Sequence, residues 1–165
     1  MYHTIDEFIL EWKAESAATS HLLDVLTDES LQQSISPGHR TLGQIAWHLV
    51  WVIGSLSSAE LQFEKPDGEE RAPSSAKKIA DEYKKVSQAL VDAVETQWKD
   101  VDLQSSQEVN GEEWSKAKSL HLLVQHEVHH RGQLTVLMRQ AGLRPPAIYG
   151  PTFDDWKDKG QTPYI

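Results

Sequence analysis

Apolar residues recur three and four positions apart in four parts of the chain, which is the period of an α-helix that buries one face. The pattern predicts helices over about residues 4–26, 41–56 and 75–98, and a fourth that starts between residues 114 and 119 and ends at Gly142. No segment shows the sustained alternation of apolar and polar residues that is typical of a half-buried strand. The sequence therefore predicts an all-α protein.

Side chains suited to helix ends support these boundaries. Thr4 is followed three residues later by Glu7, and Thr41 by Gln44. This spacing predicts a capping box, in which each side chain binds the backbone N–H of the other residue. Gly142 suits the left-handed position just after a helix, and two prolines follow it closely.

Four helices of this length predict a four-helix bundle, in which each helix turns its apolar face to a shared core. We expect one domain over residues 1–165, large enough to bury a core without disulfides. The connections over residues 27–40 and 58–74 are long enough for crossovers, so periodicity leaves the topology open. Residues 145–165 are rich in turn formers and predict a non-helical tail, whose four aromatic residues we expect to pack back onto the bundle.

The charge of the chain argues against nucleic acid as a partner. The 25 acidic and 16 basic residues give a formal net charge of −9, which repels a phosphate backbone. The longest apolar stretch, over residues 45–54, is too short to cross a bilayer, so we expect no membrane partner.

The chain has no cysteine, which excludes disulfides, thiolate metal ligands and a cysteine nucleophile. This composition fits a reducing compartment, and we expect a cytoplasmic protein. The first residues lack the pattern of a secretory signal, so the mature protein is expected to begin near Met1.

Two histidines fall on the inward side of the last predicted helix. At about 100° per residue, His130 lies in the apolar stripe and His126 lies beside it, whereas His129 is turned further toward Gln133. Histidines four residues apart share one helix face, so both imidazoles can reach one metal ion. The alternative is a pair of core histidines that bind backbone carbonyls or water.

A third histidine, His48, lies between Ile45 and Val52 at the edge of the apolar stripe of the second predicted helix. Together with His126 and His130 it would complete a set of three imidazoles from two helices. Such a set leaves metal positions open for water or substrate, as in catalytic sites. A neutral structural histidine or a surface ligand site is the alternative for His48.

The segments TLGQIAWHL (41–49) and HEVHHRGQL (126–134), followed by a glycine and paired prolines, resemble the DinB/YfiT-like family of bacterial metal-binding four-helix bundles. The resemblance implies that His48, His126 and His130 bind the metal. It also implies an up-down-down-up bundle and a homodimer.

The same resemblance implies a chemistry, because family members with assigned activities are chiefly thiol S-transferases and isomerases that use bacillithiol, mycothiol or glutathione. Our leading hypothesis is an enzyme whose three-histidine metal site presents a small thiol to an electrophilic substrate. A metal-dependent hydrolase and a non-catalytic metal or small-ligand binding protein are the alternatives. Three imidazoles favour zinc or nickel and also suit iron or copper. The sequence indicates no further catalytic residue and no organic cofactor.

Other residues of these two segments allow two interpretations each. Gln133 is either a hydrogen-bond partner of a ligand imidazole or metal-bound water, or a surface residue. We expect Arg131 to form an ion pair with a neighbouring helix rather than to bind an anion, with Gly132 allowing close helix packing. Trp47 and Trp51 either pack in the core or line the mouth of a pocket.

Overall fold

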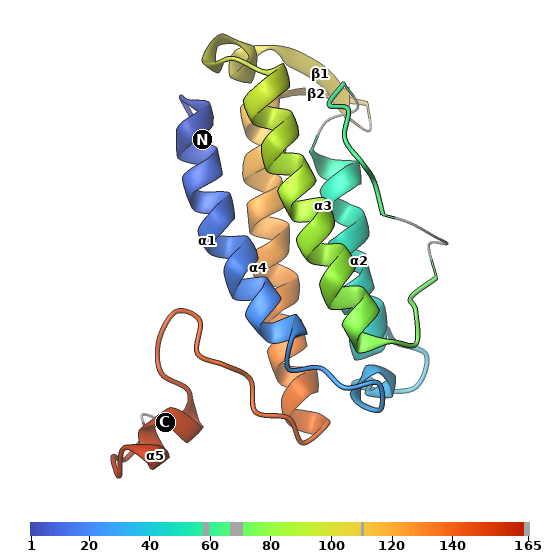
Figure 1. Ribbon diagram of the computed structural model, residues 1–165, viewed down its shortest axis with the longest axis vertical. Helices are drawn as coiled ribbons and strands as arrows, with labels where there is room; N and C mark the ends of the chain where they lie inside the picture. Colours follow the sequence, from blue (N-terminus) through green and yellow to red (C-terminus); the bar gives the residue numbers. More distant parts are fainter. Residues whose placement is uncertain (58–59, 67–70, 110, 164–165) are drawn as a thin grey trace.

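The computed structural model describes residues 1–57, 60–66, 71–109 and 111–163. Four long helices dominate it (Figure 1). They are α1 (Ile5–Leu23), α2 (Leu42–Leu56), α3 (Ala76–Gln97) and α4 (Lys116–Gln140). The shorter elements are η1 (Ser30–Gln32), η2 (Asp100–Gln104), β1 (Ser106–Val109), β2 (Glu112–Ser115) and α5 (Phe153–Asp158).

The four long helices form the predicted bundle with the up-down-down-up topology. In Figure 1, α1 and α4 run down the page, and α2 and α3 run up. Helices α1 and α2 each pack against both α3 and α4. Helices α2 and α3 start at the same end of the bundle, so the end of α2 and the start of α3 lie at opposite ends. Within the described ranges, no helix combines the length and the apolar character that crossing a bilayer requires.

The predicted helix caps are confirmed. Thr4 Oγ1 accepts the backbone N–H of Glu7, and Glu7 Oε2 accepts that of Thr4, both at 3.2 Å. Thr41 and Gln44 make the same reciprocal pair at 2.8 and 3.3 Å. Gly142 has a φ of 78°, and its N–H donates to a carbonyl of the last turn of α4. The two segments with capping boxes therefore begin as helices at the predicted residues.

The predicted all-α class is confirmed, and the structure adds one short hairpin to the helices. Strand β1 pairs antiparallel with β2, with Val109 opposite Glu112. Gly111 lies between them with a φ of 82°, a conformation that favours glycine. An Asn-Gly pair between two short segments is a hairpin signal, but strands of four residues are too short to show alternation.

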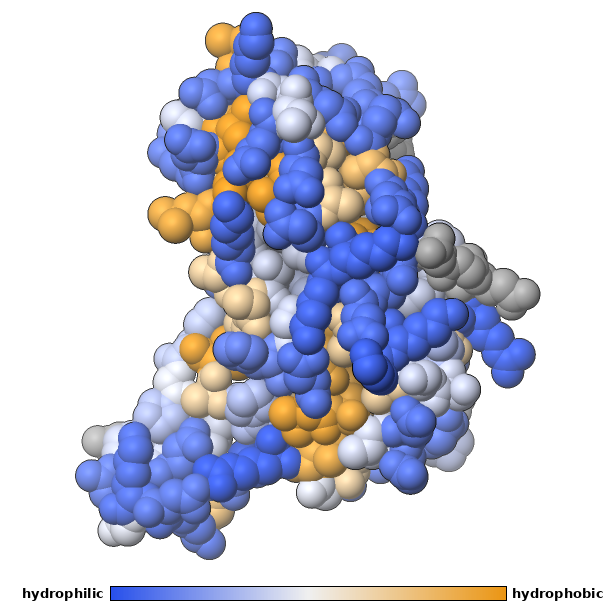
Figure 2. All heavy atoms as spheres, in the orientation of Figure 1, coloured by the Kyte–Doolittle hydropathy of each residue, from blue (hydrophilic) through white to orange (hydrophobic). Residues whose placement is uncertain are grey.

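The prediction of a non-helical tail was wrong over α5, which a capping box between Thr152 and Asp155 starts. No residue of α5 is buried, and this helix stands away from the bundle in Figure 1. Figure 2 shows a mainly hydrophilic surface on this C-terminal lobe. The expected packing onto the bundle is limited to contacts such as that of Tyr149 with Glu15 of α1, and Tyr164 lies outside the described residues.

Helix α2 begins in close contact with the segment before it. A Cβ atom added to Gly43 would lie 3.0 Å from Leu31 Cβ and 3.2 Å from the Leu31 carbonyl oxygen. Leu31 belongs to η1 and is buried, so it has little room to move. The backbone N–H of Leu42 also donates to the Gln33 carbonyl at 2.7 Å. Gly43 thus lets the connection before α2 lie directly on the helix.

We predict that Gly43→Ala lowers the free energy of unfolding by about 1–3 kcal/mol, because the added methyl group overpacks the contact with Leu31. The matched control is Gly54→Ala in the same helix, where an added Cβ would meet only Lys65 side-chain atoms at 3.6 Å or more. The free energy of unfolding of that variant should rise by about 0.5–1 kcal/mol, because alanine favours the helix more than glycine does. Urea unfolding of both variants measures the difference, and equal effects would contradict this account of Gly43.

Candidate metal centre

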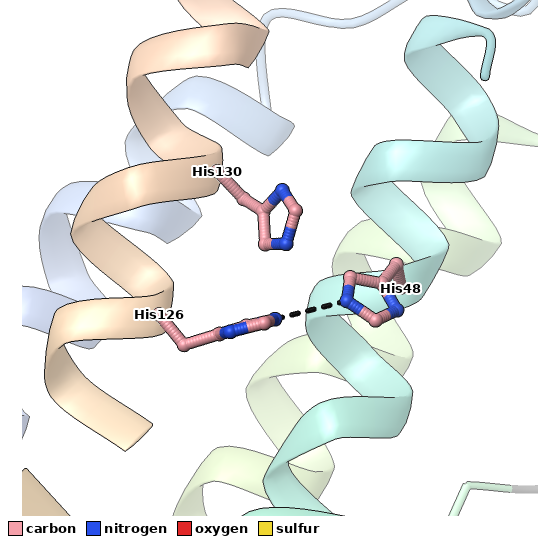
Figure 3. A group of neighbouring side chains, drawn as sticks. All are labelled: His48, His126 and His130. Carbon is pink, nitrogen blue, oxygen red and sulfur yellow. Dashed lines mark hydrogen bonds between the residues drawn. The ribbon is translucent and has the colours of Figure 1, made fainter. Parts of the chain in front are cut away.

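Three histidines from two helices face one another across the contact between α2 and α4. His48 lies on α2, and His126 and His130 lie one turn apart on α4. Figure 3 shows the three rings converging on one space between these helices. The sequence-predicted residues are therefore brought together, although 78 residues separate His48 from His126.

The spacing of the imidazole nitrogens fits one divalent ion. One nitrogen of each histidine can be chosen so that all three lie within 4.8 Å of one another. His48 Nε2 and His126 Nε2 are 2.9 Å apart, and the ring centroids are separated by 4.4–5.1 Å. Two nitrogens bound to the same ion at about 2.1 Å lie roughly 3 Å apart. The three histidines could therefore hold a metal ion.

Burial favours the neutral form of these imidazoles, which is the form that binds metal. Burial, followed by the fields of neighbouring cationic groups, lowers the pKa of His48 and of His126 to about 4. Burial also lowers the pKa of His130, which is 7% exposed. All three rings are neutral at pH 7, so each keeps a lone pair for a ligand bond.

Gln133 forms a hydrogen bond with His130 and orients its ring. This is one of the two interpretations that the sequence allowed. His130 Nδ1 lies 2.7 Å from Gln133 Oε1, an oxygen that can only accept a hydrogen bond. The proton of His130 therefore sits on Nδ1, which leaves the Nε2 lone pair free for a ligand. Gln133 Nε2 lies 3.2 Å from Nε2 of the exposed His129, which stands outside the group of three.

Glu127 and Arg131 lie about 100° further round α4 than His126 and His130, on the side that faces α1 and α3. Glu127 is fully buried, and its carboxylate accepts hydrogen bonds from Tyr83 Oη at 2.6 Å and Thr19 Oγ1 at 3.1 Å. Arg131 is 2% exposed and forms an ion pair with Glu15 of α1. The predicted role of Arg131 is thus confirmed, whereas sequence reasoning missed that Glu127 belongs to the core.

The prediction that Gly132 allows close helix packing was wrong. Gly132 is exposed, and a Cβ atom added there would meet no atom within 4 Å. The neighbouring Arg131 reaches α1 with its long side chain, so no close approach of the backbone is needed.

Two hollows flank the histidines. One, of about 350 Å³, is lined by His130 and Gln133 with apolar residues such as Ile45 and Leu137. The other, of about 240 Å³, is lined by His48 together with Trp47 and Trp51. Trp47 fits both interpretations of the sequence. It lines this hollow, and it is only 3% exposed and packed in the core.

Two larger hollows, of about 520 and 570 Å³, lie elsewhere on the surface. Neither is lined by a member of the histidine group. The convergence of three metal-binding side chains, and not the size of a hollow, therefore marks the candidate site.

A family model with the description DinB family matches residues 1–163. This chain belongs to the DinB family. The DinB protein is 47% identical over 161 residues to a Bacillus subtilis (strain 168) protein named "Uncharacterized protein YrdA". That match covers 97% of the chain and 96% of the relative.

Two crystal structures of DinB-like proteins resemble the DinB protein. The structure from Bacillus cereus ATCC 10987 has a TM-score of 0.82 at 48% identity and covers 90% of this chain and 100% of its own. The structure of YjoA from Bacillus subtilis has a TM-score of 0.67 at 14% identity and covers 88% of this chain and 99% of its own, a likeness of fold alone.

We predict about one divalent ion per chain, and a sharp loss of occupancy in His48→Ala, His126→Ala and His130→Ala. His129→Ala is the matched control and should keep the metal, because His129 lies outside the group. Elemental analysis of freshly purified protein without a histidine tag measures the occupancy. Equal metal content in wild type and His126→Ala would rule out the site.

We also predict that Glu127→Gln removes a pH dependence of stability. Burial raises the pKa of Glu127 to about 7 from an ordinary value of 4.5. The folded state therefore holds the proton more tightly, so the stabilisation present below pH 4.5 is lost as the pH rises through 7. Glutamine cannot ionise, so the variant should gain stability relative to wild type from pH 5 to pH 8.

Urea unfolding of metal-free protein across this pH range tests the effect of Glu127. Glu108→Gln, a substitution of an exposed residue on β1, gives the baseline for the same chemical change at the surface. A stability difference between wild type and Glu127→Gln that stays constant with pH would contradict the assigned role.

Proposed function

We propose that the DinB protein is a metal-dependent enzyme that transfers a small thiol to an electrophilic substrate, with His48, His126 and His130 as the metal ligands. The observation that carries the proposal is the set of three neutral imidazoles beside open hollows. A bound divalent ion lowers the pKa of a coordinated thiol, so that the thiolate forms near neutral pH. Zinc and nickel are the ions we favour.

The charge of the ligand set supports a thiolate as the bound nucleophile. Three neutral imidazoles leave the double positive charge of an ion uncompensated, and an anion is then favoured in its coordination sphere. The chain itself contains no cysteine, so the sulfur has to come from a small molecule. A low-molecular-weight thiol such as bacillithiol, mycothiol or glutathione meets this requirement.

The residues around His130 would position the second substrate. Ile35, Ile45 and Leu137 give this hollow apolar walls, which bind an apolar electrophile and strengthen electrostatic interactions by excluding water. In the transfer, the thiol sulfur forms a bond to the electrophilic carbon, the leaving group departs with the former bonding pair, and the thiol proton passes to solvent. Because the site would hold the thiol and the electrophile close together, they would react faster than the same two molecules in solution.

Hydrolysis is less favoured by the same site. A metal-dependent hydrolase commonly uses a nearby carboxylate to take the proton of water. Glu127 is the acidic residue next to His126 in sequence, but its carboxylate is buried against Tyr83 and Thr19. Among the described residues, those lining the two flanking hollows include no aspartate or glutamate.

The homodimer implied by the family resemblance and the cytoplasmic location are parts of this proposal. Val128 and Val136 of α4 are 38% and 50% exposed and both line the hollow of about 520 Å³, an apolar surface that supports a contact between copies there.

We predict that adding a low-molecular-weight thiol to cobalt-substituted protein produces a sulfur-to-metal charge-transfer band. Because the chain has no cysteine, a protein thiolate cannot be its source. The wild type should also conjugate the thiol to a model electrophile at least about tenfold faster than His130→Ala, because the variant loses one ligand of the ion.

Thiols that inhibit the consumption of ester or amide substrates would instead indicate a hydrolase. If neither thiols nor hydrolysable substrates react while the metal stays bound, the protein is a metal or small-ligand binding protein.

A further inference from the structure

Arg40 lies where the two hollows beside the histidines meet. It lines the hollow that contains His130 and also the one that contains His48. Arg40 therefore shares one hollow with His130 and Gln133 and the other with His48. Arg40 is exposed, so its guanidinium is accessible to a ligand from solvent.

The backbone on both sides of Arg40 is held in place. Thr41, the next residue, caps α2 and forms an isolated bridge with Ser34. The N–H of Leu42 donates to the Gln33 carbonyl at 2.7 Å, and this segment rests on α2 through the close contact at Gly43. The backbone position of Arg40 is therefore fixed by these hydrogen bonds and by the contact at Gly43.

Among the described residues Arg40 has no acidic partner, unlike most other arginines of the chain. Arg131, Arg139 and Arg144 each form an ion pair with a carboxylate. Over the described ranges, no carboxylate lies within ion-pair distance of Arg40 or of Arg71, which lines the hollow of His48. In a chain with a net charge of −9, two arginines that have no carboxylate partner among the described residues and line one hollow form a site that attracts an anion.

We propose that Arg40, assisted by Arg71, binds an oxyanion group of the substrate, so that the substrate of this site carries a carboxylate or a phosphate. The guanidinium fork matches both groups, which accept two parallel N–H donors. Arg40 reaches both hollows, so the anionic group would lie at their junction while the rest of the molecule extends toward the histidines. This inference names the substrate class of the proposed function and rests on it.

Anion binding to the metal-free protein tests the proposal without any reaction. Calorimetric titration with succinate and, separately, with inorganic phosphate compares wild type, Arg40→Gln and Arg139→Gln. We expect one of the two anions to bind wild type, and Arg40→Gln to weaken it about tenfold or more through loss of charge-assisted hydrogen bonds. Arg139→Gln removes an arginine that is already paired with Asp154 and should leave the affinity unchanged.

The two titrations distinguish a carboxylate substrate from a phosphate ester, because succinate represents the first and inorganic phosphate the second. Arg40→Lys keeps the positive charge but not the fork, and should recover only part of the affinity. Failure of both anions to bind wild type, or equal losses in Arg40→Gln and Arg139→Gln, would overturn the proposal.

A second measurement distinguishes this inference from the proposed function. In cobalt-substituted protein, 3-mercaptopropionate should produce the charge-transfer band at lower concentration than the neutral 2-mercaptoethanol, and Arg40→Gln should reduce that preference. If both thiols bind without preference and Arg40→Gln changes nothing, the role of Arg40 fails and thiol binding stands. If neither thiol produces a band but Arg40-dependent anion binding persists, the thiol chemistry fails and the anion site stands.

Discussion

The rotation of α4 about its own axis determines what this protein can bind, and the buried carboxylate of Glu127 fixes that rotation. Its two hydrogen bonds, from Tyr83 of α3 and Thr19 of α1, can form only with one side of α4 turned toward these helices. Leaving the carboxylate buried without them would cost several kcal/mol, on the order of the whole stability of a small domain. The same rotation turns His126 and His130 toward α2.

The histidine group places three polar rings in the contact between α2 and α4. One nitrogen of each imidazole lies within 4.8 Å of those of the other two in a partly buried contact, and burying polar nitrogens costs more than burying apolar side chains. The large apolar core along all four helices offsets this cost. The site therefore resembles many functional sites, in which local stability is lost so that reactive groups can meet.

The sequence predicted the features that depend on residues close together in the chain. Thr41 with Gln44 and His126 with His130 lie within one helical turn, so periodicity and spacing were sufficient. The burial of Glu127 and the location of Arg40 depend on which helices pack against α4 and on where the connection before α2 rests. Those are tertiary relations that a single sequence does not encode locally. The hairpin was missed because four-residue strands are shorter than the pattern used to recognise them.

The parallel arrangement of α2 and α3 affects how the protein folds. With α2 and α3 parallel, α2 meets α4 only across a long stretch of chain, and 78 residues separate His48 from His126. Closing a loop of that length costs chain entropy, so we expect contacts between α2 and α4 to form late in folding. A partly folded chain would offer a metal ion only the helical pair His126 and His130. If the three histidines bind a metal ion as proposed, the complete site would form only with the native topology, and tight binding of the ion would then indicate completed folding.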